Sequence, residues 1–367
     1  MDDQDVSLNM YESYPLSMDE LLKETAEKDA SDLHLAVGAS PTIRVNGRFI
    51  KLDYPTFTPE SLQEILYSII NEQQKNELEG NKELDTSYAI PGVARYRANI
   101  MQQRGSLAAV FRVVPFEVPH IDNLGLLPQI KELCYISRGL VLVTGPTGSG
   151  KSTTLASMIE FINKERSLNI VTIEDPIEFL HQHNRSIIKQ REVGIDTHDF
   201  ATALRHVLRH DPDVILIGEM RDMETISIAL TAAETGHVVF STLHTQTAPL
   251  TVNRIVDVFE NHKRNQVRQQ LSNTIRGVIY QKLVPMHNKQ GRVPAIEFMG
   301  DTPAVKNMIR EGKEHQLYNA IQTGSAQNMQ TMDQALVQLY KEGKITKKTA
   351  VDHCVQEEEI ERLLKNI

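Results

Sequence analysis

The sequence predicts an α/β protein in which a small α+β domain precedes a larger domain with a parallel sheet and a helical C-terminal part. A glycine-rich loop at residues 145–152 lies between an apolar run and a helical pattern, the order typical of a phosphate-binding domain. Strand and helix patterns alternate after this loop, whereas hairpins and amphipathic helices fill residues 17–114. The chain has 367 residues, more than one hydrophobic core usually covers, so two or three compact units are expected.

Residues 17–114 are expected to form the α+β domain, after an acidic extension over 1–16 that is expected to be disordered. Ser17 and Glu20 have the spacing of a capping box that opens the first helix. A second helix is expected to begin at Thr58-Pro59, because threonine caps helices and proline fits the first helical position. The strands are expected at 33–37, in a hairpin at 43–50 that turns at Asn46-Gly47, and at 85–90, 93–101 and 107–114.

Proline residues mark an expected linker over residues 115–128. The core of the larger domain is expected over 129–285, and a helical region is expected over 286–367. Apolar helices separate the core strands, a pattern typical of parallel sheets with crossover connections. These strands are expected at 140–143, 170–173, 214–217 and 238–241.

The composition restricts the class of protein. The chain carries 39 basic and 48 acidic residues, a net charge of −9, and no basic tail, which disfavours a surface that neutralises a nucleic-acid backbone. Cys134 and Cys354 are too far apart in sequence for a C-x-x-C site, which fits a reducing cytoplasm. The acidic start excludes an ordinary secretory signal, and no apolar stretch approaches the ~18 residues that span a bilayer. We therefore expect a soluble protein that reaches membranes only through a partner.

The loop at 145–152 is a complete G-x-x-x-x-G-K-S motif. Glycines let backbone N–H groups surround an anion, and the helix that begins near Lys151 adds the positive end of its dipole. Lys151 is expected to reach the β- and γ-phosphates and Ser152 to hold Mg²⁺, so the motif predicts a nucleoside triphosphatase rather than a plain glycine-rich turn. The residues expected to contact the nucleotide are Gly145, Pro146, Thr147, Gly148, Ser149, Gly150, Lys151, Ser152 and Thr153.

Later strands of the predicted sheet end in carboxylates, at the edge where ligands bind in such sheets. Glu219 is expected to contact Mg²⁺ and to polarise the attacking water, with a strand-end surface acid as the alternative. Glu178 could equally activate the water, and the sequence does not choose between these two bases. Glu174 and Asp175 are expected to contribute through second-shell waters at the same nucleotide.

Two histidines and three arginines complete the candidate residues. His244 is expected to sense the γ-phosphate, with a merely hydrogen-bonded histidine as the alternative, and a nucleotide role for His237 stands on even terms with none. Arg95 and Arg97 lie two apart on one strand, hence on one face, and Arg112 lies on the next strand. A charged solvent face is the simplest interpretation of these arginines.

Four ordered segments carry a resemblance to a known family. They are the phosphate loop, Thr172-Ile173-Glu174-Asp175-Pro176-Ile177-Glu178, residues 211–222 and residues 236–245. In order and spacing they resemble the type II/IV secretion ATPase superfamily, and within it the PilT-type retraction ATPases of type IV pili. Ala30-Ser31-Asp32-Leu33-His34-Leu35 is similar to the start of the PAS-like N-terminal domain of that family. The resemblance runs from Ser17 to the C-terminal helices.

The resemblance implies a RecA-like ATPase core that uses ATP and Mg²⁺, preceded by a PAS-like domain. Glu219 follows Gly218 in the family's atypical Walker B form, so Glu219 is expected to serve both metal and water, with Ser152 as the other metal ligand. Arg95, Arg97 and Arg112 are expected to reach the γ-phosphate of a neighbouring subunit as fingers, a role worth ~10³ to 10⁵ in rate.

The same resemblance implies a homohexameric motor with active sites at its subunit interfaces. Its expected partners are an inner-membrane pilus platform protein and an accessory retraction ATPase, with no nucleic acid and no direct membrane insertion. The protein is expected in the cytoplasm, peripheral to the inner membrane at the pilus base. Its activity would disassemble the pilus and drive twitching motility.

One departure and four alternatives limit this interpretation. The family's C-terminal A-I-R-N-L-I-R-E motif stands here as residues 304–311, with Lys306 in place of an arginine, which keeps charge but loses the planar fork. An accessory PilU-like ATPase shares the motifs. Extension and type II secretion ATPases typically carry further N-terminal domains and a four-cysteine zinc insertion, neither of which we recognise. A nucleic-acid translocase and a non-catalytic nucleotide-binding scaffold are alternatives from other classes.

Overall fold

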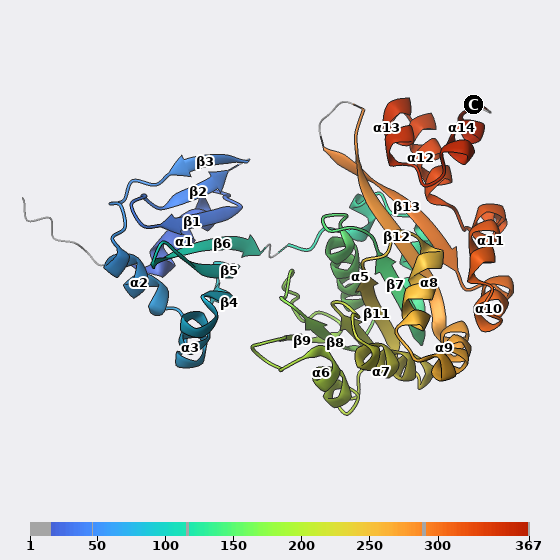
Figure 1. Cartoon of the computed structure of the whole chain (residues 1–367), viewed down its shortest axis with the longest axis horizontal. Helices are drawn as coiled ribbons and strands as arrows, with labels where there is room; N and C mark the ends of the chain where they lie inside the picture. The colour runs from blue at the N-terminus through green and yellow to red at the C-terminus, as the bar shows by residue number, and fades with distance from the viewer. Residues whose placement is uncertain (1–15, 46, 115–116, 288–290, 366–367) are drawn as a thin grey trace, which may run out of the picture. The chain divides into compact units, whose positions relative to one another are not determined.

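The computed structural model describes residues 16–45, 47–114, 117–287 and 291–365 (Figure 1). The chain divides into two compact units, residues 1–116 and 117–367. All of the predicted disordered extension except Leu16 lies outside the described residues.

The first unit is an antiparallel sheet with three helices among its described residues. The strand order is β3-β2-β1-β6-β5-β4, which can be followed in Figure 1. The helices are α1 (Met18–Glu27), α2 (Pro59–Tyr67) and α3 (Glu72–Asn81). The strands are β1 (Asp32–Ala36), β2 (Thr42–Val45), β3 (Arg48–Lys51), β4 (Glu83–Ile90), β5 (Ala94–Gln103) and β6 (Ser106–Val114).

Two expected helix caps of this unit are present, whereas the predicted turn at Asn46-Gly47 includes Asn46, which lies outside the described residues. The Ser17 hydroxyl accepts from the Glu20 N–H while the Glu20 carboxylate accepts from the Ser17 N–H, which is the predicted capping box. Thr58 caps α2 in the same way through Ser61. The helices bury one face of the sheet, where Tyr96, a fully buried side chain, is part of the core.

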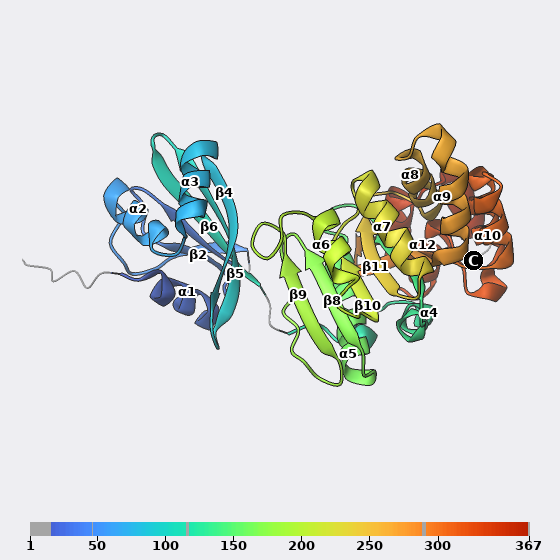
Figure 2. The same ribbon diagram turned by 90° about the horizontal axis from the view of Figure 1, so that it is seen from below.

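The second unit is built around a mixed sheet in the order β13-β12-β7-β11-β10-β8-β9 among the described residues. Figure 2 shows β9, β8, β10 and β11 side by side in that order. These four strands, β7 and β12 run parallel, and β13 pairs antiparallel with β12. The strands are β7 (Gly139–Thr144), β8 (Asn169–Glu174), β9 (Ile187–Glu192), β10 (Val214–Ile217), β11 (Val238–Leu243), β12 (Ile275–Pro285) and β13 (Arg292–Gly300).

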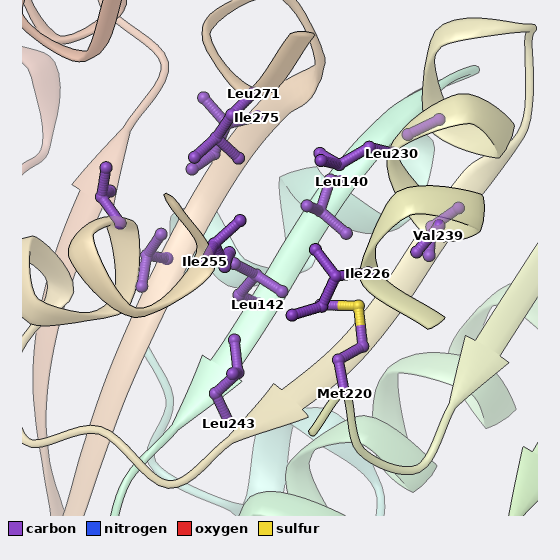
Figure 3. Close-up of a cluster of buried hydrophobic side chains, with 14 of the residues drawn as sticks. Leu140, Leu142, Met220, Ile226, Leu230, Val239, Leu243, Ile255, Leu271 and Ile275 are labelled. Atoms are coloured by element: carbon purple, nitrogen blue, oxygen red, sulfur yellow. The ribbon is translucent and has the colours of Figure 1, made fainter. Parts of the chain in front are cut away.

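Helices cover both faces of this sheet because the buried side chains of β7 alternate between them. Val141 and Val143 pack with α5 on one face, whereas Leu140 and Leu142 pack with α7 and α8 on the other, as Figure 3 shows. The helices are α4 (Pro128–Glu132), α5 (Lys151–Glu165), α6 (Phe200–Val207), α7 (Met223–Glu234), α8 (Ala248–Asp257), α9 (Asn261–Thr274), α10 (Pro303–Arg310), α11 (Leu317–Thr323), α12 (Met332–Lys341), α13 (Lys347–His353) and α14 (Glu357–Lys365).

The structure differs from the predicted boundaries at two places. Part of the predicted linker over 115–128 packs against the second unit. Ile121 is buried in its core, and the Ser157 hydroxyl of α5 donates to the Pro119 carbonyl at 2.7 Å. The predicted boundary at 285/286 falls inside the β12–β13 hairpin, so the helical region begins only at α10. The strand β13 was missed because Pro294 interrupts its pattern.

Among the described residues, no helix is long and apolar enough to cross a membrane. Cys134 and Cys354 are both free thiols.

Candidate nucleotide site

The phosphate loop joins the end of β7 to the start of α5, as predicted, and is shaped by contact with β12. At Gly145, where φ is 143°, an added Cβ would lie 2.3 Å from the Gln281 carbonyl oxygen. At Gly150, where φ is 87°, it would lie 2.8 Å from Nε2 of the same glutamine. At Gly145 only glycine avoids the strand backbone, and at Gly150 the positive φ favours glycine while a side chain would also displace the Gln281 amide.

Gln281 on β12 was not predicted and holds the loop from behind. Its Nε2 donates to the Ser149 carbonyl at 2.8 Å, and its Oε1 accepts from the Thr154 hydroxyl at 2.9 Å. One buried side chain thus connects the loop, the first turn of α5 and the neighbouring strand. No sequence motif marks it, since it lies far along the chain from the loop.

Lys151 lies folded against the loop at the start of α5. Its Nζ donates to the carbonyl oxygens of Gly145 at 2.9 Å and Pro146 at 3.1 Å. Burial lowers the pKa of Lys151, and the nearby charges of Glu178 and Glu219 oppose that shift. The Lys151 ammonium therefore lies at the loop, where the charges of Glu178 and Glu219 act on it.

The loop fits a phosphate group on two further observations. The buried Ser149 hydroxyl has no hydrogen-bond partner among the described residues. The N-terminus of α5 follows Gly150, which offers no side-chain cap, so its first N–H groups face the loop. Pro146, Thr147 and Gly148 form the exposed tip, and Ser152 and Thr153 are half-buried in the first turn.

Glu219 and His244 meet where β10 and β11 end. The Glu219 Oε2 lies 3.6 Å from the His244 Nε2, and the Glu219 Oε1 lies 2.6 Å from the Arg221 Nε. Burial lowers the pKa of His244, the charge of Lys151 lowers it further, and Glu219 opposes both. The imidazole is consequently neutral near pH 7. Lys151, predicted from the phosphate loop, and Glu219 and His244, predicted from the ends of two strands, thus gather at one edge of the sheet.

The segment after β8 is held from behind by β9. The Gln190 amide donates to the Phe179 carbonyl at 2.8 Å, and the Glu192 carboxylate accepts from the Ile177 N–H at 3.0 Å. These bonds fix the backbone on either side of Glu178, whose side chain is exposed. Neither β9 residue was predicted, because β9 is short and mostly polar.

Glu174 and Asp175 differ in surroundings. Burial raises the pKa of Glu174, whose Oε1 accepts from the Thr172 hydroxyl at 2.6 Å and from the Gln190 amide at 3.2 Å. Glu174 therefore supports the loop after β8 from within. Asp175 is exposed.

The predicted nucleotide role of His237 does not hold for the site of its own chain. His237 precedes β11, and its carbonyl accepts from the Gly139 N–H, so it lies at the amino end of β7. The phosphate loop follows the opposite end, about 20 Å away for six residues of strand. The His237 Nδ1 instead lies 2.9 Å from the Ala232 carbonyl. The predicted strand at 238–241 already placed His237 before it and His244 after it, and β11 confirms that order.

The three predicted arginines lie on the sheet of the first unit. Arg97 stands directly opposite Arg112, and both side chains are exposed. The Arg112 Nε donates to Asp32 at 2.9 Å, and this bond, with one from Ser31, lowers the pKa of Asp32 against the opposing effect of burial. Arg95 donates through Nη2 to the Ser87 hydroxyl at 2.7 Å.

The donor set also fits Mg²⁺. In phosphate sites Mg²⁺ takes one or two protein ligands together with substrate phosphates. Ser152 on α5 and Glu219 after β10 are the residues that would hold it. Within the described part of the chain, no cluster of three or more histidine, cysteine or acidic side chains could hold a metal by itself.

Comparisons with known proteins agree with this arrangement. Residues 95–366 match the family model described as Type II/IV secretion system protein. The chain is 47% identical over 335 residues to the type IV pilus retraction ATPase PilT of Pseudomonas aeruginosa, covering 91% of this chain and 97% of that protein. It is 48% identical over 311 residues to a twitching motility protein of Neisseria gonorrhoeae, covering 85% and 83%.

A solved structure has the same overall fold. The pilus retraction motor PilT with bound ADP superposes with a TM-score of 0.88 at 49% identity, covering 95% of this chain and 99% of that one. The mixed α/β fold expected from the sequence is therefore confirmed.

Replacing Gln281 by leucine is predicted to destabilise the second unit. The Ser149 carbonyl and the Thr154 hydroxyl would lose a buried partner, and each loss costs about 1–3 kcal/mol. The free energy of unfolding, measured with urea, is expected to fall by roughly 2–5 kcal/mol. Thr154→Ser, which keeps the hydroxyl, is the matched control. An unchanged unfolding midpoint for Gln281→Leu would mean that the loop does not depend on this amide.

Proposed function

The chain belongs to the type II/IV secretion system protein family, and we propose that it is a hexameric ATPase motor that powers type IV pilus retraction. The observation that carries the proposal is the convergence of Lys151, Glu219 and His244 on a complete phosphate loop. The relatives named above extend over nearly the whole chain, so the activity in their names applies to a protein of this size.

In the proposed reaction, the loop and the first turn of α5 bind the β- and γ-phosphates of ATP, and Lys151 supplies positive charge to them. Ser152 and Glu219 would hold Mg²⁺, which would supply positive charge to the phosphates. Glu219 orients the attacking water through the carboxylate that faces His244. Glu178 is the alternative base, because its charge also acts on Lys151. The neutral His244 offers one N–H to the γ-phosphate.

The finer architecture belongs to the same proposal. The second unit is RecA-like, and the first is PAS-like, with Asp32 and His34 in the segment that resembles the start of such domains. A head-to-tail contact between copies that closes into a ring would give the hexamer. Arg97 and Arg112, which are exposed on the first unit, would then reach the phosphates of a neighbouring copy. An inner-membrane platform protein would receive the motion at the cytoplasmic base of the pilus.

Rival functions make different predictions. A PilU-like accessory ATPase would hydrolyse ATP but would not retract pili by itself. Cells that lack an extension ATPase would have no pili. Cells that lack a type II secretion ATPase would not secrete. A nucleic-acid translocase would bind DNA with a steep salt dependence. A non-catalytic scaffold would show no turnover.

Glu219→Gln is predicted to keep ATP binding but nearly abolish turnover, because the amide preserves shape and removes the anion that orients water and metal. Lys151→Ala should lose binding as well. The measurements are nucleotide affinity and steady-state hydrolysis. Glu178→Gln is the matched variant, and near wild-type turnover in Glu219→Gln with a dead Glu178→Gln would transfer the base to Glu178.

The arginine proposal predicts recovery of activity in mixed rings. Arg97→Ala and Lys151→Ala subunits, each inactive alone, should partly restore hydrolysis together, because some interfaces would join an intact loop to an intact finger. Arg112→Ala should behave in the same way. The control is a mixture of Lys151→Ala and Glu219→Gln, which damage the same side of the interface. If mixed hexamers, verified by mass, show no recovery at any ratio, Arg97 is a solvent-exposed charge and not a finger.

The segment at 304–311 is predicted to transmit force rather than catalyse. Its helix α10 buries Val305 and Ile309, whereas Lys306 bonds Asp301 at 2.7 Å and Arg310 is exposed. Such half-exposed ion pairs contribute about 0–1 kcal/mol. Lys306→Ala with Arg310→Ala should therefore leave hexamers and most hydrolysis intact but stop twitching.

Two assays check this prediction, the hydrolysis rate of the purified protein and colony spreading of the parent strain. A double variant of exposed lysines elsewhere, Lys263→Ala with Lys347→Ala, is the control and should change neither. Loss of hydrolysis together with spreading would place the segment in catalysis, and loss of neither would make it structural.

A further inference from the structure

Glu297 on β13 is a fully buried carboxylate that binds the first residue of two helices. Its Oε1 accepts from the Ala248 N–H at 2.6 Å, and its Oε2 accepts from the Met332 N–H at 3.3 Å. Ala248 begins α8 and Met332 begins α12. One side chain therefore joins a helix next to the nucleotide site to a helix of the C-terminal region.

The bonding pattern has a simple physical cause. The first N–H groups of a helix have no partner within it and carry partial positive charge. Thr247 caps α8 through the Leu250 N–H, and Thr331 caps α12 through the Gln334 N–H. These caps leave the N–H of each first residue to Glu297, so both helix N-termini converge on one carboxyl group.

A short series of contacts connects Glu297 to the nucleotide site. Thr245, which follows His244, bonds the Thr251 hydroxyl of α8 at 2.6 Å. Thr144, the last residue before the phosphate loop, pairs with Tyr280, and Tyr280 pairs with Glu297. Glu297 therefore lies on the row that crosses the sheet at the level of the loop.

We propose that Glu297 is a positioning residue that fixes the His244 loop through α8 and couples it to α12 and the C-terminal helices. This inference rests on the proposed ATPase function. In this arrangement, a shift of the His244 loop on hydrolysis moves α8, and the shared carboxylate carries that displacement to α12.

The pKa of Glu297 reflects its buried position. Burial raises its pKa to about 7, the two N–H bonds act against that shift, and the Asp333 carboxylate adds to it while the Lys282 ammonium opposes it. The other titratable groups nearby are Tyr280 on β12 and Tyr318 on α11. Because the folded-state pKa is raised, the contribution of Glu297 to stability is complete below its ordinary pKa and is lost as pH rises through about 7.

The test uses full-length Glu297→Gln, in which one acceptor oxygen becomes an amide nitrogen. The matched control is Asp333→Asn, because Asp333 is also buried and accepts two N–H bonds, but these come from Val355 at 2.7 Å and Gln356 at 3.0 Å, in the segment before α14, rather than from α8. In Glu297→Gln, kcat for ATP is expected to fall about tenfold with KM within about twofold, since the phosphate loop is held by Gln281 and not by this residue. In Asp333→Asn, kcat should stay within about twofold of wild type.

Amide hydrogen exchange gives a readout that does not depend on turnover. Glu297→Gln should lose protection at residues 244–250 and 331–335, whereas Asp333→Asn should lose it near 355–360. The decline in unfolding free energy between pH 5 and pH 8 should also become shallower in Glu297→Gln. If the wild type fails to hydrolyse ATP, the proposed function fails, and the exchange pattern still decides the role of Glu297.

Two results would overturn the inference. One is a folded Glu297→Gln with wild-type kcat and unchanged exchange at 244–250, and the other is an equal loss of kcat in Asp333→Asn. If Glu297→Gln does not fold, Ala248→Pro tests the same bond from the donor side, because proline lacks the N–H and suits the first helical position. Wild-type kcat in a folded Ala248→Pro would count equally against the coupling.

Discussion

The nucleotide site depends on the close approach of the phosphate loop to β12. At Gly145 the loop backbone runs so near the Gln281 carbonyl that no side chain fits, and the buried glutamine amide joins the loop to the first turn of α5. This contact determines where the helix N-terminus and the Lys151 ammonium lie relative to the sheet. Glu219 and His244 follow neighbouring parallel strands, so their side chains lie at the same edge of the sheet.

Carboxyl groups in the two units have pKa values that are shifted in opposite directions. Asp32 is held ionised by Arg112, so its pKa is lowered although burial acts against this. Glu174 and Glu297 instead accept hydrogen bonds from hydroxyl, amide and backbone N–H groups, and burial raises the pKa of each. Both of these acids accept hydrogen bonds that fix segments beside the nucleotide site. The acids that shape the site are thus distinct from Glu219, which faces it.

Sequence reasoning predicted the elements around the candidate site because these elements obey local rules. The apolar strands β7, β8, β10 and β11 and the complete phosphate loop were predicted, and Lys151, Glu219 and His244 were brought together as expected. The polar elements α3 and β9 were missed, since their burial depends on neighbours rather than on their own pattern. Gln281 and Glu297 could not be predicted, because their importance comes from contacts with segments far away in the sequence. For His237 the sequence left a nucleotide role and no such role on even terms, and the structure places it at the amino end of β11, away from the phosphate loop.

Counting pili on cells that lack this chain tests the retraction account most directly. Electron microscopy of a deletion strain, complemented by the wild-type chain or by Glu219→Gln, would be compared with the parent. The account predicts that deletion leaves an excess of pili that do not retract, that wild-type protein restores normal numbers, and that Glu219→Gln does not. Bald cells after deletion would contradict it and would assign the chain to pilus extension.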